Sequence, residues 1–241
     1  MERPSTVITA GALLVAAGVA FLATSVYLFV VLTGAGFEIE MFDDPVLLMP
    51  WAAAHERLYQ GLWVLYFLTQ AALLLVPSLL GEHLHHRATA VLGTAAVILA
   101  MVGVVVFFAA GPVVAEAYVD GEAPAPSVLA LHDVAADIAK DLRLFSELLL
   151  GSWLVAVGIQ LRRASGRAAW WLMSVLGTWT FVVAAWKLAD PAIPHEDWLG
   201  FLLGLGYLGL GVAMIVSGRR AVVTAPAASG GTDSIGDTTV P

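Results

Sequence analysis

The chain has 241 residues, of which 60% are hydrophobic and 12% are charged, and its formal net charge is −8. An ordinary soluble domain has about 25% charged residues, so most of this chain is expected to lie in lipid. The absence of cysteine excludes disulfides, thiolate metal sites and cysteine nucleophiles. The acidic balance offers no basic surface for nucleic acid, and neither a phosphate-binding loop nor a dinucleotide fingerprint is present.

Six apolar segments are long enough to cross a membrane. A bilayer core of about 30 Å needs about 20 apolar residues in a helix, and an open sheet cannot satisfy its backbone in lipid. The fold is therefore predicted to be an all-α bundle of six transmembrane helices, none of them clearly broken at mid-depth. The segments run roughly over Val7–Leu32, Leu58–Leu80, Ala88–Ala110, Leu142–Leu161, Ala168–Leu188 and Trp198–Val216.

The connections between these segments differ in charge. The turns "GEHLHHRA" and "RRASGR" and the closing "GRR" are short and basic, whereas "GFEIEMFDDP", the segment from Pro112 to Asp141, and "DPAIPHEDW" are acidic. Because Arg and Lys mark the cytoplasmic side, both termini are predicted to be cytoplasmic and the acidic connections to face outward from the plasma membrane. Residues 1–220 form the transmembrane domain, and the low-complexity residues 221–241 are predicted to be a disordered cytoplasmic tail.

Polar and aromatic residues fall on one face of the second span. At 100° per residue they share an arc of roughly 120°, while the opposite face is Leu, Ala and Val. A polar residue near the bilayer midplane, such as Gln70, is expected to face protein or water. This face is therefore predicted to point into the bundle, and its members are Glu56, Tyr59, Gln60, Trp63, Tyr66, Gln70 and Pro77.

The fourth span carries a carboxylate, Glu147, on the same face as Gly151 and Gly158. Glycines allow close approach of membrane helices, so this face is predicted to pack against protein. The charged residues that precede it form an extramembrane helical extension, in which Asp137 is spaced to pair with Lys140 and Arg143 with Glu147.

The partner of Glu147 is left open between Arg143, Lys187 and a ligand. For Lys187, near the end of the fifth span, the favoured interpretation is snorkelling to the interface beside Asp190. A contact with Glu147 at the same depth is the alternative. The glycines of the sixth span, including the GxxxG of Gly200 and Gly204, are interpreted as tight packing within the bundle rather than as a dimer interface.

Ionisable residues inside a membrane are candidates for a functional site. The outward half of the bundle is therefore a candidate ligand-binding site, although a structural ion-pair network that caps the bundle is the favoured interpretation of these charges. No cofactor and no catalytic residue are predicted. The candidate ligand-binding residues are Glu56, Tyr59, Gln60, Tyr66, Gln70, Asp137, Lys140, Glu147 and Lys187.

Three outward histidines, His55, His132 and His195, are each followed by an acidic residue. Together they could bind zinc, with the carboxylates as supporting partners. They come from three separate segments and lack the spacing of a known zinc motif, so a zinc site is the minor hypothesis.

Four stretches carry a resemblance to a known family. They are "DDPVLLMPWAAAHERLYQGLWVLYFL", "LALHDVAADIAKDLRLF", "QLRRASGRAAWWLMSVLG" and "LGYLGLGVAMIVSGRR", and the resembling features run from the first span to Arg219. The chain resembles the six-span bacterial and archaeal membrane proteins of domain-of-unknown-function family 4386. His132 is the residue most associated with that pattern. The resemblance implies the six-span fold and its topology, and it implies no activity.

The sequence as a whole indicates a non-enzymatic multi-pass protein of the plasma membrane. Its outward polar site would bind or pass a small ligand, lipid or cation, or the chain would act as an accessory subunit. The alternative is a membrane enzyme with an outward metal or acid–base site. The expected partners are the lipid bilayer and either further copies of the chain or a larger membrane complex, with no nucleic acid.

Overall fold

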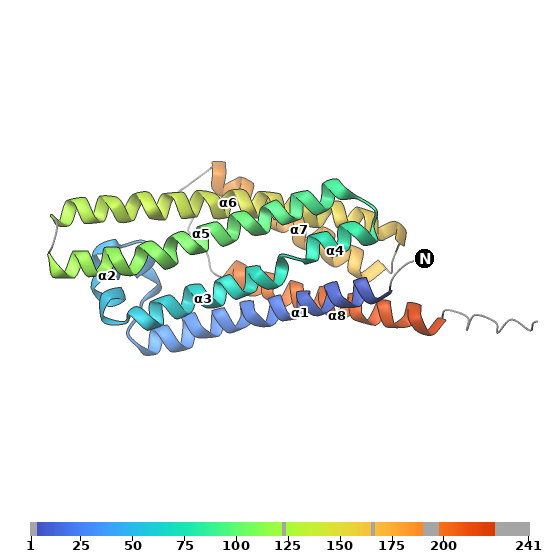
Figure 1. Cartoon of the computed structure of the whole chain (residues 1–241), viewed down its shortest axis with the longest axis horizontal. Coiled ribbons are helices and arrows are strands. Elements are labelled where there is room, and N and C mark those ends of the chain that lie inside the picture. Colours follow the sequence, from blue (N-terminus) through green and yellow to red (C-terminus); the bar gives the residue numbers. More distant parts are fainter. Residues whose placement is uncertain (1–3, 122–123, 165–166, 190–197, 225–241) are drawn as a thin grey trace, which may run out of the picture.

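The computed structural model describes residues 4–121, 124–164, 167–189 and 198–224 (Figure 1). Within these ranges all regular structure is helical, which confirms the predicted all-α fold. The elements in chain order are α1 (Pro4–Val26), the π-helix η1 (Tyr27–Leu32), the 3₁₀-helix η2 (Ile39–Phe42), α2 (Pro45–Ala54), α3 (Glu56–Leu73), α4 (Val76–His83), α5 (Arg87–Asp120), α6 (Ala125–Ala164), α7 (Arg167–Ala189) and α8 (Trp198–Thr224).

Six helical segments of the described chain are long and apolar enough to cross a membrane, one for each predicted span. The chain is therefore a multi-pass membrane protein with a six-helix bundle. The segments are Ser5–Leu32, Glu56–His83, Arg87–Asp120, Ala125–Arg162, Trp170–Ala189 and Leu202–Arg220.

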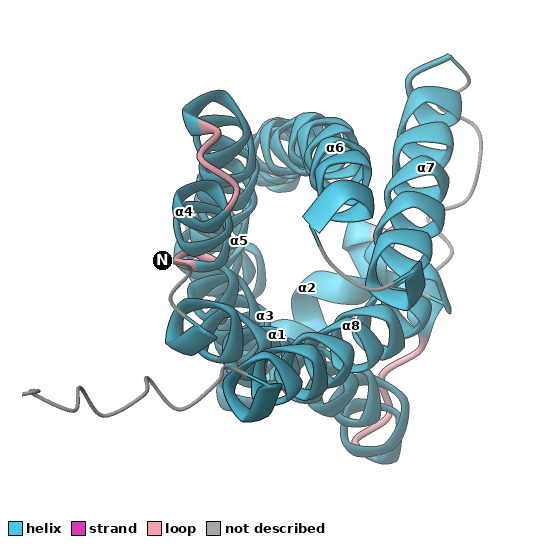
Figure 2. Cartoon of the chain, turned by 90° about the vertical axis from the view of Figure 1, so that its right-hand side faces the viewer, coloured by secondary structure: helices cyan, strands magenta, loops and turns pink. Residues whose placement is uncertain are grey.

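The six spans are arranged as a ring when the bundle is viewed along its length (Figure 2). Helix α1 packs against α8 on one side and α3 on the other, and α3 and α4 pack against α5. Helix α6 follows α5, α7 packs on α6, and a smaller contact between α7 and α8 closes the ring. Consecutive spans are thus mostly neighbours, and α1 and α8 bring the two ends of the chain together.

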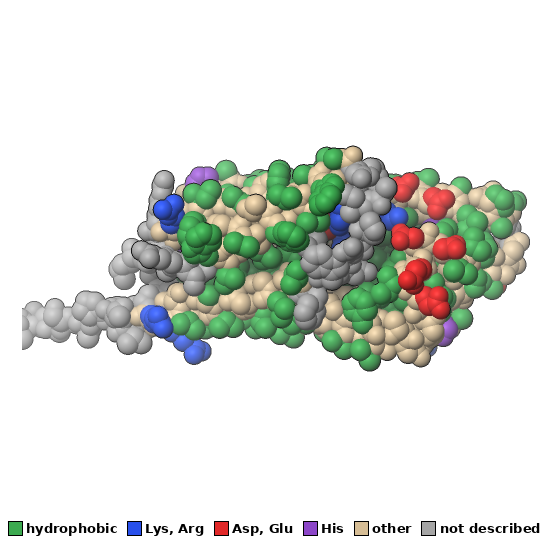
Figure 3. All heavy atoms as spheres, turned by 180° about the vertical axis from the view of Figure 1, so that it is seen from behind, with side chains coloured by type: hydrophobic (Ala, Val, Ile, Leu, Met, Phe, Trp, Pro, Cys, Tyr) green, Lys and Arg blue, Asp and Glu red, His purple; other side chains and the backbone are tan. Residues whose placement is uncertain are grey.

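Helices α5 and α6 are longer than a bilayer requires. At 1.5 Å per residue, their 34 and 40 residues span roughly 51 and 60 Å, against a hydrocarbon core of about 30 Å. Both project at one end of the bundle, where Asp and Glu side chains gather (Figure 3). We call this end, formed by residues 33–56, 112–121 and 124–141, the acidic end.

The predicted extension of α6 is confirmed, but the expectation that a connection begins at Pro112 is wrong. Helix α5 continues through Pro112 to Asp120. A proline inside a helix removes one backbone hydrogen bond, and packing against α2 offsets that loss, since Val114 and Ala115 of α5 are buried. Periodicity alone could not predict this, because the packing partner lies in another segment.

The acidic end has a core of its own. The predicted acidic connection between the first two spans folds into η2 and α2, and Asp44 caps α2 by accepting a hydrogen bond from the Val46 N–H at 3.0 Å. Phe37 packs edge-to-face on Trp51, whose indole N–H donates to the Ala35 carbonyl at 3.1 Å. These contacts fold the connection over the start of α3.

Close helix contacts at glycines hold the spans together. A side chain on Gly151 of α6 would place its Cβ 2.8 Å from the Gly177 carbonyl oxygen of α7. A Cβ on Gly11 of α1 would lie 2.8 Å from the Gly211 carbonyl oxygen of α8. The Glu147 face of α6 is thus a packing face, as predicted, and Gly211 serves packing within the bundle.

The second span is interrupted, contrary to the expectation that no span is broken. Helix α3 ends at Leu73 and α4 begins at Val76, with Pro77 in its first turn. Proline has no N–H for the Leu73 carbonyl and its ring clashes with that carbonyl in a continuous helix, which explains the break. The α3 half of the span lies toward the acidic end, where its residues line a cavity.

Candidate functional site

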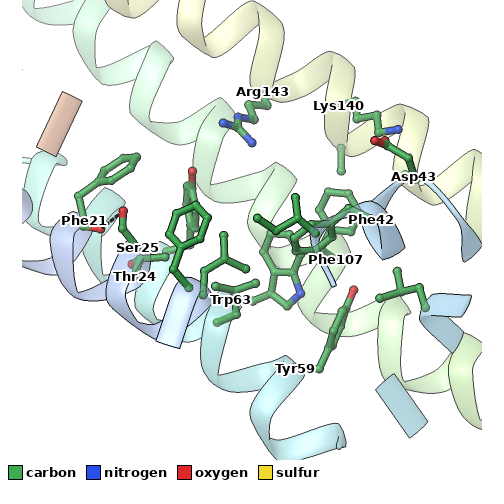
Figure 4. A pocket seen from close by; sticks show the side chains of 18 of the residues that line it. Phe21, Thr24, Ser25, Phe42, Asp43, Tyr59, Trp63, Phe107, Lys140 and Arg143 are labelled. Atoms are coloured by element: carbon green, nitrogen blue, oxygen red, sulfur yellow. Dashed lines mark hydrogen bonds between the residues drawn. The ribbon is translucent and has the colours of Figure 1, made fainter. Parts of the chain in front are cut away.

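Two adjoining cavities lie inside the half of the bundle that leads to the acidic end. The larger, which we call the mouth chamber, has a volume of about 140 Å³ and is lined by residues of α1, η1, η2, α2, α3, α5 and α6 (Figure 4). The smaller, the inner chamber, has a volume of about 90 Å³ and reaches Gln70 of α3 and Leu203 of α8. The residues that border both are Phe21, Trp63, Tyr66, Phe107, Ala139 and Arg143.

Aromatic side chains form much of the wall between and around the chambers. Trp63 of α3 stacks on Phe107 of α5, with ring centroids 4.6 Å apart and an interplanar angle of 7°. Tyr66 packs edge-to-face on Phe21 at 5.4 Å, and Tyr59 packs edge-to-face on Trp63 at 5.9 Å. The i, i+3, i+4 and i+7 spacing along α3 places these rings on one face, as predicted.

Three charged side chains meet beside the inner chamber. Arg143 donates a hydrogen bond from Nε to Glu147 Oε1 at 3.0 Å, one helical turn apart on α6. Lys187 of α7 approaches from the other side, with Nζ 3.8 Å from Glu147 Oε2. Glu147 therefore contacts both of the cations that the sequence left as alternatives.

The favoured interpretation of Lys187 is corrected by this contact. Its side chain is 9% exposed and directed to Glu147 instead of snorkelling to the interface, and Asp190 lies outside the described residues. The correction has a physical reason. The Gly151–Gly177 contact brings α6 and α7 close enough for a lysine side chain to reach a carboxylate on the neighbouring helix.

The mouth chamber opens beside charged residues of the acidic end. Asp43, which follows η2, and Lys140 of α6 are exposed and both line the chamber, toward the same edge in Figure 4. His132 of α6 also lines it and is buried. Charged groups of both signs thus flank the opening, and the aromatic wall lies behind them.

Five of the nine predicted ligand-binding residues line the chambers: Tyr59, Tyr66, Gln70, Lys140 and Glu147. Lys187 does not line a chamber itself, but it contacts Glu147, which lines the inner chamber. The remaining three, Glu56, Gln60 and Asp137, do not line either chamber.

Of these three residues, Glu56 and Asp137 are exposed at the acidic end and Gln60 is half-buried on α3. The Gln60 side-chain amide donates to Glu56 Oε1 at 2.9 Å, one turn apart on the exposed side of α3. Phe42 and Leu48, from the segment expected to be an acidic loop, form the chamber wall at this level instead. Asp137 is exposed, and the predicted Asp137–Lys140 ion pair is not formed among the described residues.

The structure does not bring the candidate zinc ligands together among the residues it describes. Nδ1 of His55 lies 3.1 Å from the Trp51 carbonyl oxygen, and its ring stacks on the Trp51 indole. No group of three His, Asp or Glu side chains within the described ranges is placed to hold a metal ion. His195 lies outside those ranges, so the three-histidine site stays a prediction.

Sequence reasoning missed four important wall residues: Phe21, Asp43, Phe107 and Arg143. Phe107 lies in a span with few polar residues, where no periodic signal distinguishes an inward ring from a lipid-facing one. Phe21 shares a helix face with Thr24 and Ser25, polar residues that also line the mouth chamber and could have marked this face. We predicted that Arg143 stabilises its own helix through an i,i+4 ion pair with Glu147, and this ion pair is confirmed. Its position at both chambers follows from the packing of α5 against both α3 and α6.

The fold and the chambers define a polytopic helical membrane protein with an aromatic and charged internal site. No protein-family model matches the chain, and comparisons with curated proteins and with solved structures found no match either.

Proposed function

We propose that the chain is a non-enzymatic protein of the plasma membrane that binds a small amphipathic ligand in the mouth chamber. The observation that carries the proposal is a cavity lined by seven aromatic side chains together with an accessible guanidinium group. Ligand sites are typically concave and mostly apolar, with a few polar groups that fix orientation. We also propose that the acidic end faces outward and that the resemblance to family 4386 reflects common descent.

The charges favour ligand binding over the passage of a cation. Glu147 lines the inner chamber, but its side chain is only 11% exposed. Arg143 and Lys187 both contact it, and two cations beside one carboxylate leave little attraction for a further cation. A cation path along the chambers would need carboxylates that remain accessible.

Blocking the mouth chamber tests this function. Ala136 of α6 is buried and lines the chamber, so Ala136→Leu would fill part of its volume without changing any charge. Ala109 of α5 is exposed on the outer side of the same bundle, and Ala109→Leu is the matched control. Both variants add the same atoms, and only one adds them inside the cavity.

The measurement is the thermal unfolding midpoint of each purified protein in a neutral detergent, with neutral, anionic and cationic six-carbon amphiphiles as probes. A ligand at about 100 times its Kd stabilises a protein by about 2.7 kcal/mol. We expect at least one probe class to raise the midpoint saturably in the wild type and in Ala109→Leu, but not in Ala136→Leu. If Ala136→Leu responds like the wild type, or if no probe raises the midpoint, the proposed function is wrong.

A further inference from the structure

Among the residues that the structure describes, Arg143 is the charged side chain that borders both chambers. Its side chain is 40% exposed, against 11% for Glu147 and 9% for Lys187. Figure 4 shows the Arg143 side chain reaching from α6 toward the aromatic side chains. Arg143 is therefore the more exposed member of its ion pair and lies within reach of a ligand in either chamber.

The surroundings of Arg143 fix its orientation. The Nε atom donates to Glu147 at 3.0 Å, and the guanidinium carbon lies 5.9 Å from the centre of the Tyr66 ring. An arginine held in this way is preorganised, because its planar fork of donors is directed before a ligand arrives. Such a fork matches the geometry of a carboxylate, to which arginine can form two parallel hydrogen bonds.

The neighbouring charges select against ligands with more than one negative charge. Glu147 is within hydrogen-bonding distance of Arg143, and Asp43 lines the mouth. Exposed acidic side chains also gather at the acidic end (Figure 3). A second negative charge on a ligand would be repelled by these groups, whereas a single carboxylate on Arg143 gains more from its direct contact than it loses.

The aromatic wall defines the other half of the ligand. The stacked Trp63 and Phe107 rings and the edge of Phe21 offer an apolar surface beside Arg143. An apolar cavity of about 150 Å³ holds a molecule of the size of benzene, and the mouth chamber has about 140 Å³. The apolar part of the ligand should therefore be a phenyl ring or a short alkyl chain.

We propose that the chambers bind a small amphipathic monocarboxylate, with its carboxylate on Arg143 and its apolar body against Trp63 and Phe107. This inference rests on the proposed function and adds the chemical class of the ligand. Short-chain fatty acids and aryl-substituted acids share this chemistry, and hexanoate and 3-phenylpropanoate represent the two sources.

Wild-type selectivity gives the first test. Kd values for hexanoate and 3-phenylpropanoate at pH 7 are compared by calorimetry with those for hexanamide, hexylamine and the dianion hexanedioate. A hydrogen bond to a charged group contributes about 1.5–3 kcal/mol, so we expect the monocarboxylates to bind about ten- to a hundredfold more tightly than the amide. Hexanedioate and hexylamine should bind more weakly than hexanoate. The tighter of the two monocarboxylates identifies the source.

Substitutions at the ion pair give the second test. Glu147→Gln keeps Arg143 and removes its negative neighbour, so hexanoate affinity should be equal or higher. Arg143→Lys keeps the charge but loses the fork, and affinity should fall several-fold. The double variant Arg143→Gln/Glu147→Gln removes one charge of each sign, and its preference for hexanoate over hexanamide should disappear. A purely structural Arg143 would lower stability in these variants without changing that preference.

The outcomes separate the inference from the function on which it rests. If hexanamide or hexylamine binds the wild type as tightly as hexanoate, and Ala136→Leu abolishes that binding, the chamber is a ligand site but the carboxylate assignment is wrong. If the double variant keeps the wild-type preference, the assignment to Arg143 is wrong. If no probe binds in a way that depends on Ala136, both proposals fail. Should the double variant not fold, the wild-type ratio of hexanoate to hexanamide decides the question alone.

Discussion

The contact between Lys187 and Glu147 predicts a measurable coupling between α6 and α7. Lys187→Met removes the ammonium group and keeps much of the apolar length of the side chain. At the observed 3.8 Å separation, two unit charges attract each other by about 4 kcal/mol at an effective dielectric constant of about 20. Withdrawing both groups from water offsets part of this attraction, so we expect a net loss of about 2 kcal/mol in the free energy of unfolding.

The neighbouring Arg143–Glu147 pair contributes less, although its separation of 3.0 Å is shorter. The Arg143 side chain is 40% exposed, and solvent screening reduces partly exposed pairs to about 1 kcal/mol or below. After Lys187→Met, the carboxylate keeps this one contact. The loss should therefore stay below the 3–5 kcal/mol expected when a buried charge has no partner left.

A double-mutant cycle isolates the coupling. The free energy of unfolding is measured by denaturing-detergent titration in mixed micelles for the wild type, Lys187→Met, Glu147→Gln and the double variant. We expect an interaction energy of about 2 kcal/mol between the two positions, within the usual range for residues in contact. In thermal scans, Lys187→Met should unfold about 4–8 °C below the wild type.

The chain offers a matched control, because Lys140 is its other lysine and is exposed, with no ion pair among the described residues. Lys140→Met should change stability by no more than about 0.5 kcal/mol. An interaction energy below about 0.5 kcal/mol between positions 187 and 147, or equal losses in the two lysine variants, would refute the reasoning. Lys187 would then behave as an interfacial residue.

Two further predictions concern packing and topology. Gly151→Ala would place a Cβ 2.6 Å from the Phe181 backbone nitrogen and should lower the free energy of unfolding by about 1–3 kcal/mol. In the control Gly209→Ala the new Cβ meets nothing within 4 Å, so the free energy of unfolding should change by no more than about 0.5 kcal/mol. Similar losses in the two variants would contradict the close packing of α6 on α7. Because the chain has no cysteine, single cysteines introduced at the exposed positions Asp137 and Glu82 can report the orientation in the membrane. A membrane-impermeant maleimide should label Asp137→Cys in intact cells, and Glu82→Cys only after permeabilisation. The reverse labelling pattern would overturn the proposed orientation.

The inward face of the second span shows which side-chain positions the helical period can predict and which it cannot. The helical period correctly placed Tyr59, Tyr66 and Gln70 at the chambers, because a polar residue in an apolar span must face protein or water. The same period failed for Glu56 and Gln60. Near the end of a span water is available on any side, so the period no longer determines where a polar side chain lies.

The extent of α5 and the identity of the chamber wall were beyond the sequence for a related reason. The wall residue Phe107 comes from a span with few polar residues to mark an inward face, and α5 continues past Pro112 because α2 packs on it. Both features depend on contacts between segments far apart in the chain. Local propensity contains no information about such contacts.

The sequence by itself determined the six spans, the all-helical fold and the packing face of α6. The length, composition and glycine spacing of each apolar segment can be read without knowing its neighbours. Because an unpaired backbone group is costly in lipid, such a segment forms a helix. Only the tertiary structure decided the partners of Glu147 and the position of Arg143 at the chambers. A charge inside a membrane must find a partner, but which partner it finds depends on which helices close packing brings within reach of its side chain.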